Sequence, residues 1–414
     1  MTPWMTAGEA AGLLQVGRAT LYAYVSRGYV RSQPTPGSSR DRRYSREDVE
    51  RLRRRTEERR DPDKAAARAL QWGMPILESS IALIDGERLY YRGHDAVALS
   101  RSRSVAEVAS LIWTARFDTT FGAGPTRHTV PRQLLGLDLP FLARAQSVLA
   151  GASAGDPFGF DLRLYGVAST GWRILQILTR AAVPAVAPVS RIELTLARAW
   201  GVSSRGADLL RSALILCADH ELNVSSFTAR CVASAGSDPY AVVIAGLAAL
   251  GGTRHGGVSA RVESTLASVR RARKIKAAVA DRLRRGEAID GFGHPLYRHG
   301  DPRAAALLDL LSDSYAASAE LAFVTEFADA AASALRERPT IDFALAGVSR
   351  VLKLPVGSPL TLFAIGRTIG WIGHAIEQYA TGLLIRPRAK YVGAAVVSEP
   401  VVPTHPGRES SPEV

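Results

Sequence analysis

Apolar residues recur with helical spacing along most of the chain after residue 70. Stretches rich in Ala and Leu carry apolar residues three and four positions apart, the pattern of a helix with one buried face. The clearest of these stretches are 191–200, 206–217, 240–250 and 258–284. Sustained strand-like alternation is rare, and no period of about 20–50 residues indicates a repeat fold. The pattern predicts a mainly all-α protein.

One segment departs from this pattern. Residues 81–92 contain two apolar runs separated by Asp85-Gly86. A short turn dipeptide between two such runs is a hairpin signal. We therefore expect a small β-hairpin at the start of the helical region.

The N-terminal residues predict two short helices joined by a tight turn. Thr6 and Glu9 have capping-box spacing, which indicates a helix start. The first helix is expected to end at a turn through Val16-Gly17, and a second helix is expected over 18–26. Two helices in this relation have helix-turn-helix geometry.

The residues that follow predict a wing and a third helix. Arg27-Gly28-Tyr29-Val30, a polar Pro/Gly/Ser stretch and Arg42-Arg43-Tyr44 indicate two short strands, after which Ser45 caps a helix. In this order the elements resemble the winged helix-turn-helix of the MerR and excisionase type. We assign this domain to 1–55 and a charged, Pro-broken linker to 56–70.

Charge supports an interaction with polyanions. The 414-residue chain has a formal net charge of +13, and residues 1–70 carry 15 Lys and Arg against 9 Asp and Glu. Such an excess attracts phosphate, so DNA is a possible partner of residues 1–55. Two alternatives stay open: general arginine-rich usage, and a solvated helix face over 51–60.

Other features bear on location. The chain has 2 cysteines, which indicate neither a disulfide framework nor a metal site. No signal-peptide core and no long uncharged apolar run is present, so we expect a cytoplasmic protein that does not enter a membrane. The Pro-rich residues 398–414 are expected to form a flexible tail.

Three histidines lie in polar or Gly-rich settings that leave an imidazole accessible: His220, His255 and His294. Two neutral imidazoles can act on two carbonyl groups if a carboxylate serves as the base. The residues alone leave five candidates for that base: Asp85, Asp219, Glu221, Asp301 and Asp342.

Arginines form a second set of candidates. Arg367 stands in an apolar helical stretch, where a guanidinium requires an anionic partner. Bidentate pairing with carboxylates suits a small dicarboxylate ligand, although an ion pair within the protein is the alternative. The other members of the set are Arg298, Arg303, Arg386 and Arg388.

These motifs, in this order, resemble citrate synthase. The most specific is Gly-Phe-Gly-His-x-x-Tyr-Arg-x-x-Asp-Pro-Arg, which begins at Gly291. Ala-Asp-His-Glu-Leu-Asn precedes it, and Gly-Arg-Thr-Ile-Gly-Trp-Ile-Gly-His and Arg-Pro-Arg follow it. The resemblance runs from Glu78 to about Gly393. It implies a large helical domain over 71–255 and 353–397 with an inserted small helical domain over 256–352.

The resemblance also implies catalytic roles. His255 would hydrogen-bond the thioester carbonyl, Asp342 would remove the methyl proton, and His294 would polarise the ketone of oxaloacetate. His220, Arg303, Arg367 and Arg386 would bind oxaloacetate, with Arg386 supplied by the partner subunit of a homodimer. Arg298, Gly291 and Gly293 would bind CoA. Neither a metal nor a cofactor is implied, since the CoA thioester is itself a substrate.

Two departures from the family pattern affect the substrate more than the reaction. Val258-Ser259-Ala260 stands where the family usually has Ala-Asn-Glu, and Ala344 replaces a usual Tyr, which is expected to enlarge the acyl pocket. The expected reaction is condensation of acetyl-CoA or propionyl-CoA with oxaloacetate, giving citrate or 2-methylcitrate and CoA. The alternative is a DNA-binding regulator whose synthase-like domain only senses a metabolite.

Overall fold

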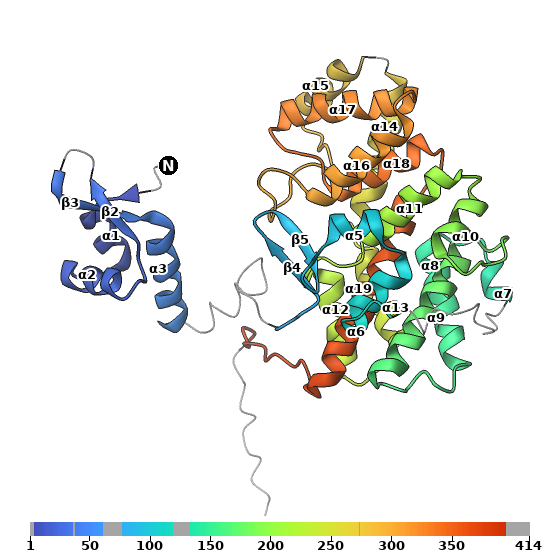
Figure 1. Ribbon diagram of the computed structural model, residues 1–414, viewed down its shortest axis with the longest axis horizontal. Helices are drawn as coiled ribbons and strands as arrows, with labels where there is room; N and C mark the ends of the chain where they lie inside the picture. The colour runs from blue at the N-terminus through green and yellow to red at the C-terminus, as the bar shows by residue number, and fades with distance from the viewer. Residues whose placement is uncertain (1–3, 36–37, 61–76, 119–131, 273, 395–414) are drawn as a thin grey trace, which may run out of the picture. The chain divides into compact units, whose positions relative to one another are not determined.

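The computed structural model describes residues 4–35, 38–60, 77–118, 132–272 and 274–394 (Figure 1). These residues form two compact units, one up to Glu78 and one from Ser79 onward. Most of the expected linker and the whole expected tail lie outside the described residues.

The first unit is a small winged helix-turn-helix. The capping box predicted at Thr6 and Glu9 is present at the start of the first helix. A short strand not predicted from the sequence pairs with the wing and makes a three-stranded sheet in the order β1-β3-β2. The elements are β1 (Trp4–Met5), α1 (Ala7–Leu14), α2 (Arg18–Ser26), β2 (Ser32–Thr35), β3 (Ser38–Ser45) and α3 (Arg46–Arg60).

The third helix of this unit starts where Ser45 predicts. The Ser45 Oγ accepts from the backbone N–H of Asp48 at 3.3 Å, and the buried Asp48 carboxylate accepts from Arg31. The helix then continues to Arg60. It therefore extends beyond the domain boundary expected at residue 55 and into the expected linker, because the Arg- and Glu-rich run has good helix propensity.

A three-stranded hairpin sheet opens the second unit. Strands β4 (Ala82–Asp85) and β5 (Arg88–Tyr91) pair antiparallel, and β6 (His94–Asp95) extends the sheet. The hairpin predicted here is confirmed, but its two loop residues are Gly86 and Glu87, which both have positive φ. Two consecutive positive φ angles match the twist of the strands.

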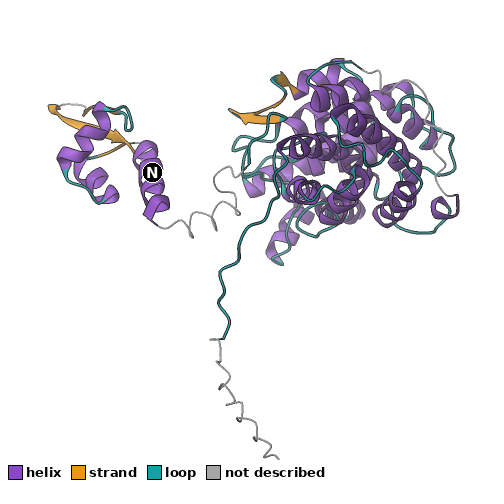
Figure 2. Cartoon of the chain, turned by 90° about the horizontal axis from the view of Figure 1, so that it is seen from below, coloured by secondary structure: helices purple, strands orange, loops and turns teal. Residues whose placement is uncertain are grey.

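Helices form the rest of the second unit, and the strands lie at its edge (Figure 2). The stretch 258–284 was expected to be continuous but forms two helices, with basic residues in the last turn of the first favouring its end there. The helices are α5 (Ala96–Ser102), α6 (Val105–Thr114), α7 (Arg132–Leu135), α8 (Phe141–Ala154), α9 (Leu164–Ala182), α10 (Ile192–Ala199), α11 (Ser204–Leu216), α12 (Val224–Ser234), α13 (Pro239–Leu250), α14 (Gly257–Arg271), α15 (Ile275–Arg284), α16 (Pro302–Tyr315), α17 (Ala319–Leu335), α18 (Ile341–Val351) and α19 (Ser358–Thr381).

Two hydrophobic cores lie within the second unit. The larger surrounds α19, which is buried along most of its length. The smaller involves α14, α15, α17 and one face of α18, at one end of the unit in Figure 1. The expected small domain (256–352) supplies all of the smaller core, but α16 and the other face of α18 pack into the larger one. The two cores therefore meet at α16 and α18.

Among the described residues, no helix combines the length and the apolar character that crossing a bilayer requires.

Candidate active site

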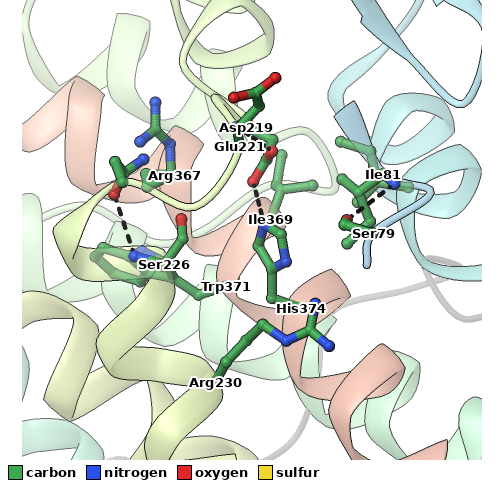
Figure 3. Close-up of polar contacts among 12 residues, drawn as sticks. Ser79, Ile81, Asp219, Glu221, Ser226, Arg230, Arg367, Ile369, Trp371 and His374 are labelled. Carbon is green, nitrogen blue, oxygen red and sulfur yellow. Dashed lines mark hydrogen bonds and ion pairs between the residues drawn. The ribbon is translucent and has the colours of Figure 1, made fainter. Parts of the chain in front are cut away.

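One face of α19 carries three polar side chains into the protein interior. Arg367, Trp371 and His374 are spaced so that they project from the same side of the helix, as Figure 3 shows. Gly370 lets the turn after α11 approach closely, because a Cβ there would collide with Asp219. The turn is held by a hydrogen bond from the Gly370 N–H to the Ala218 carbonyl at 2.9 Å.

Arg367 is a buried cation with a free donor. Its side chain is 1% exposed, and Nε donates to the Cys217 carbonyl at 2.8 Å. Its Nη2 has no hydrogen-bond partner among the described residues. An unsatisfied buried donor of this kind is costly, which favours an anionic ligand at this point.

The turn after α11 presents His220. The preceding Asp219 is fully buried and its Oδ2 lies 3.0 Å from Nε2 of His374 (Figure 3). His220 Nε2 lies 2.9 Å from the hydroxyl of Tyr297. Burial and the nearby Arg303 guanidinium hold the pKa of His220 well below its usual value, so its imidazole is neutral.

His294 lies on the loop that also contains Gly291, Gly293 and Arg298, the residues expected to bind CoA. Its ring is 5.1 Å from that of His220, centroid to centroid. Gly291 and Gly293 both have positive φ, and the loop bonds to the strand-like segment before α18 through Gly293 N–H to Arg338 O at 2.9 Å. Burial and then Arg303 lower the pKa of His294 to about 4.

Arg303 belongs to a buried ion pair. Its Nε and Nη2 donate to both carboxylate oxygens of Asp301 at 2.9 and 2.8 Å. Asp301 also caps α16 and accepts from the Ile341 N–H, which ties α16 to α18. Burial alone would raise the pKa of Asp301, but Arg303 holds it below its ordinary value. The carboxylate is therefore ionised and fixed.

His255 is oriented by a serine on α12. The Ser225 Oγ lies 2.8 Å from His255 Nε2 and accepts from Trp371 Nε1 at 3.2 Å. Ser225 Oγ is also 2.7 Å from Asn223 Oδ1. The hydroxyl has one proton for two acceptors, so its orientation decides which nitrogen of His255 is protonated. Burial and then Arg367 lower the pKa of His255 to about 4.

Asp342 lies in the first turn of α18. Its Oδ1 accepts from the Ser259 hydroxyl on α14 at 2.6 Å; Ser259 is fully buried and Asp342 is half-buried. Burial raises the pKa of Asp342, while Ser259 and Arg303 oppose that rise. A carboxylate with a raised pKa suits proton abstraction.

The geometry of the site agrees with the resemblance of the sequence to citrate synthase. Residues 180–388, about half of the chain, match the family described as "Citrate synthase, C-terminal domain". The chain belongs to the citrate synthase family. Residues 4–56 match a family described as "Helix-turn-helix domain".

Individual members of the citrate synthase family show how far the likeness extends. Citrate synthase 2 of Bacillus subtilis is 36% identical over 189 residues, 45% of this chain and 51% of that protein. The chain spans about half the length of this and several other curated relatives. Citrate synthase of Haloferax volcanii is 29% identical over 78% of this chain and 94% of its own length. The crystal structure of citrate synthase from Thermotoga maritima is 26% identical, with a TM-score of 0.63, and the match covers 79% of this chain and 96% of that one.

Most of the residues that resemble the citrate synthase site are neighbours in this structure. The charge of Arg367 lowers the pKa of His255. The charge of Arg303 lowers the pKa values of His220, His294 and Asp342. Arg386 is not among them, because it lies exposed beyond the end of α19. Arg298 is exposed on the His294 loop.

The other candidate bases have different surroundings. Asp85 is exposed on the hairpin, Asp219 faces His374, and Asp301 is paired with Arg303. Glu221 is half-buried, with a pKa raised by burial. Asp342 and Glu221 are both half-buried and free of an ion pair in the described structure, and Asp342 is the one whose carboxylate is held by Ser259 and influenced by Arg303.

Some residues of the site were not singled out as site residues from the sequence. Tyr297, which contacts His220, belongs to the motif that begins at Gly291, so it could have been identified from the sequence. Ser225 had no such signal, because its contacts with His255 and Trp371 join segments far apart in the chain. Asp219 was a candidate base and His374 ends a quoted motif, but the pairing of the two had no signal for the same reason. Ala344 was expected to line the acyl pocket, but it is buried in the larger core, two residues from Asp342 on α18 and so not on its face.

Proposed function

We propose that this chain condenses an acyl-CoA with oxaloacetate to give a citrate-type product and CoA. The observation that carries the proposal is the combination of the half-buried carboxylate of Asp342 with neutral His255 and His294 and the unsatisfied guanidinium of Arg367. This set supplies a base, two neutral hydrogen-bonding groups and an anion site.

The proposed reaction begins with enolisation of the thioester. Asp342 takes a proton from the carbon next to the thioester carbonyl, and His255 donates a hydrogen bond to that carbonyl oxygen as negative charge develops there. Donation through Nδ1 requires Nε2 of His255 to accept from the Ser225 hydroxyl. A neutral imidazole is the right form for this donor.

Carbon–carbon bond formation follows. The enol carbon attacks the ketone carbon of oxaloacetate, and His294 gives a proton to the ketone oxygen. Arg303, Arg367 and His220 would hold the dicarboxylate during this step. Water then hydrolyses the thioester and releases CoA.

Turnover tests this proposal directly. Purified protein with acetyl-CoA and oxaloacetate should release free CoA, measured with a thiol reagent. Asp342→Ala should lower the rate by at least about 100-fold, since general bases contribute about 10²–10⁴-fold. Asp309→Ala, which alters an exposed acid on α16, is the matched control. No release from acetyl-, propionyl- or longer acyl-CoA by a folded protein would refute the proposal.

The choice of acyl donor belongs to the same assay. Acetyl-CoA and propionyl-CoA differ by one methylene, which is worth only about 1–3 kcal/mol in a pocket. The ratio of kcat/KM for the two donors therefore assigns the product as citrate or 2-methylcitrate.

We further propose that the active unit is a homodimer in which Arg386 completes the neighbouring site. The position of Arg386 within its own chain supports this. The Ile385 N–H donates to Ser234 Oγ at 3.1 Å, at the opposite end of α12 from Ser225, and Ser225 is the residue that contacts His255.

DNA binding by the first unit is a second proposal. In this geometry α2 is the helix that would enter the major groove, and its exposed residues include Arg18, Thr20 and Tyr22. Arg42 on the wing is exposed as well. Binding to a duplex should fall steeply with salt, and Arg18→Ala and Arg42→Ala should each reduce the salt slope by about one. Arg284→Ala, an exposed change in the second unit, should leave the slope unaltered.

The alternative of a metabolite-sensing regulator makes a different prediction. A sensor needs the arginines that bind oxaloacetate but needs no base. The sensor would be favoured if the protein binds oxaloacetate without releasing CoA and if Asp342→Ala leaves oxaloacetate binding unchanged. The half-buried carboxylate of Asp342, which has no ion pair among the described residues, supports the enzyme instead.

A further inference from the structure

A serine stands where the family usually has asparagine, and it contacts the catalytic carboxylate. Ser259 is the third residue of α14 and is fully buried. Its Oγ lies 2.6 Å from Oδ1 of Asp342, the length of a charge-assisted O–H···O⁻ bond. The contact joins α14 to α18 across 83 positions of sequence.

The helix that carries Ser259 begins directly after His255. The backbone N–H of Ser259 donates to the Gly256 carbonyl at 3.2 Å, so its position is fixed by the first turn. Packing of Val262 and Leu266 with Phe343 in the smaller core holds α14 against α18. About one helical turn therefore separates His255, the proposed hydrogen-bond donor to the enolate, from Ser259, which contacts the proposed base Asp342.

We propose that Ser259 is a positioning residue for Asp342: its hydroxyl donates to Oδ1, holds the carboxylate in one orientation and leaves Oδ2 as the atom that accepts the substrate proton. This inference rests on the proposed function and specifies the atom that acts in it. When Oδ2 takes the proton, the carbon–hydrogen electron pair stays with the enolate, and the Ser259 bond to Oδ1 is retained.

A hydroxyl is well suited to this position. It has a single proton and two lone pairs, and it rotates to suit the protonation state of its partner. The charged and titratable groups that act on Asp342 are Arg303 and Asp301, and Asp342 in turn acts on Arg261 and Cys217. Ser259 is the group that bonds to the carboxylate of Asp342 through its side chain.

Removing the donor should shift the acid limb of the pH profile. Loss of a hydrogen bond to the ionised form makes ionisation harder, so the limb of kcat/KM should move to higher pH. The shift in Ser259→Ala should be about one pH unit or more, the size expected for a hydrogen bond to a charged group. Ser259→Asn, the residue common in the family, should restore a donor and return the limb toward its original position.

Two further variants separate positioning from packing. Ser259→Cys nearly preserves volume but donates weakly, so it should resemble Ser259→Ala in its pH profile while keeping the fold. Ser264→Ala, an exposed serine on the same helix, should leave the profile unaltered. Acid limbs of Ser259→Ala and Ser259→Cys that coincide with that of the unmodified chain would overturn the inference.

A readout without turnover separates this inference from the proposed function. An infrared difference titration against Asp342→Asn isolates the Asp342 carboxyl in unliganded protein. The carboxyl should titrate at higher pH in Ser259→Ala than in the unmodified chain. Equal titration would overturn the role of Ser259, whereas absence of CoA release alone would overturn the proposed reaction.

Discussion

The position of Arg386 predicts complementation between two inactive variants. Arg367 and Thr381 are 14 residues apart on α19, about 21 Å at 1.5 Å per residue. Beyond Thr381 the chain is held at the distal end of α12, where Ile385 bonds to Ser234. Ser225 at the other end of that helix is nine residues away, about 14 Å. Arg386 is therefore too far from the site of its own chain to bind its substrate.

The expected activity follows from the composition of the dimers. Arg386→Ala and Asp342→Ala should each be nearly inactive alone. In a heterodimer, the site built on the Arg386→Ala chain keeps its own Asp342 and receives an intact Arg386 from its partner. The other site lacks both groups. Each heterodimer has one working site of two, so the isolated heterodimer should have about half of the full activity per dimer.

The assay uses two differently tagged variants, coexpressed and purified through both tags to isolate the heterodimer. CoA release is then compared with that of each homodimer. A pairing of Arg367→Ala with Asp342→Ala is the control, because both residues belong to one chain's site and neither heterodimer site is intact. A verified Arg386/Asp342 heterodimer without activity, from an otherwise active enzyme, would refute the shared site.

Three other predictions concern the buried groups. Burial raises the pKa of Asp342, so ionisation of this carboxyl opposes folding above that pKa. Asp342→Asn should therefore raise Tm by a few degrees near pH 7. The gain should disappear as the pH falls toward about 4. Ser225→Ala should lower kcat by about tenfold through loss of the hydrogen bond to His255, with little change in KM for oxaloacetate. His374→Ala leaves the buried Asp219 without its side-chain partner and should lower the free energy of unfolding by about 2–4 kcal/mol in urea titration.

Local signals predicted much of the fold. The capping box at Thr6 and the helix over 18–26 depend on residues close in sequence, and both are confirmed. The hairpin near Gly86 was likewise predicted from its turn residues. The division of 258–284 into two helices was missed because apolar residues recur with helical spacing on both sides of the break, and the basic last turn of α14 is only a weak end signal.

The candidate site was predicted as a set of residues but not as a set of contacts. His220, His294 and Arg303 come from motifs that are recognisable in sequence, and the structure brings them together. The bonds of Ser225, Ser259 and His374 join different helices, and no spacing in the chain encodes them. Helix packing produces these contacts, so they become visible only when the fold is known.

Glycines along α19 explain how one helix serves both the core and the site. Gly366 and Gly370 have no room for a Cβ, because the turn formed by the end of α11 lies directly against them. That approach is what brings the Cys217 carbonyl within 2.8 Å of Arg367 and Asp219 within 3.0 Å of His374. A side chain at either glycine would push the turn away and move His220 with it. The glycines between the polar residues of α19 are therefore as necessary to the proposed oxo-acid site as the arginine that they flank.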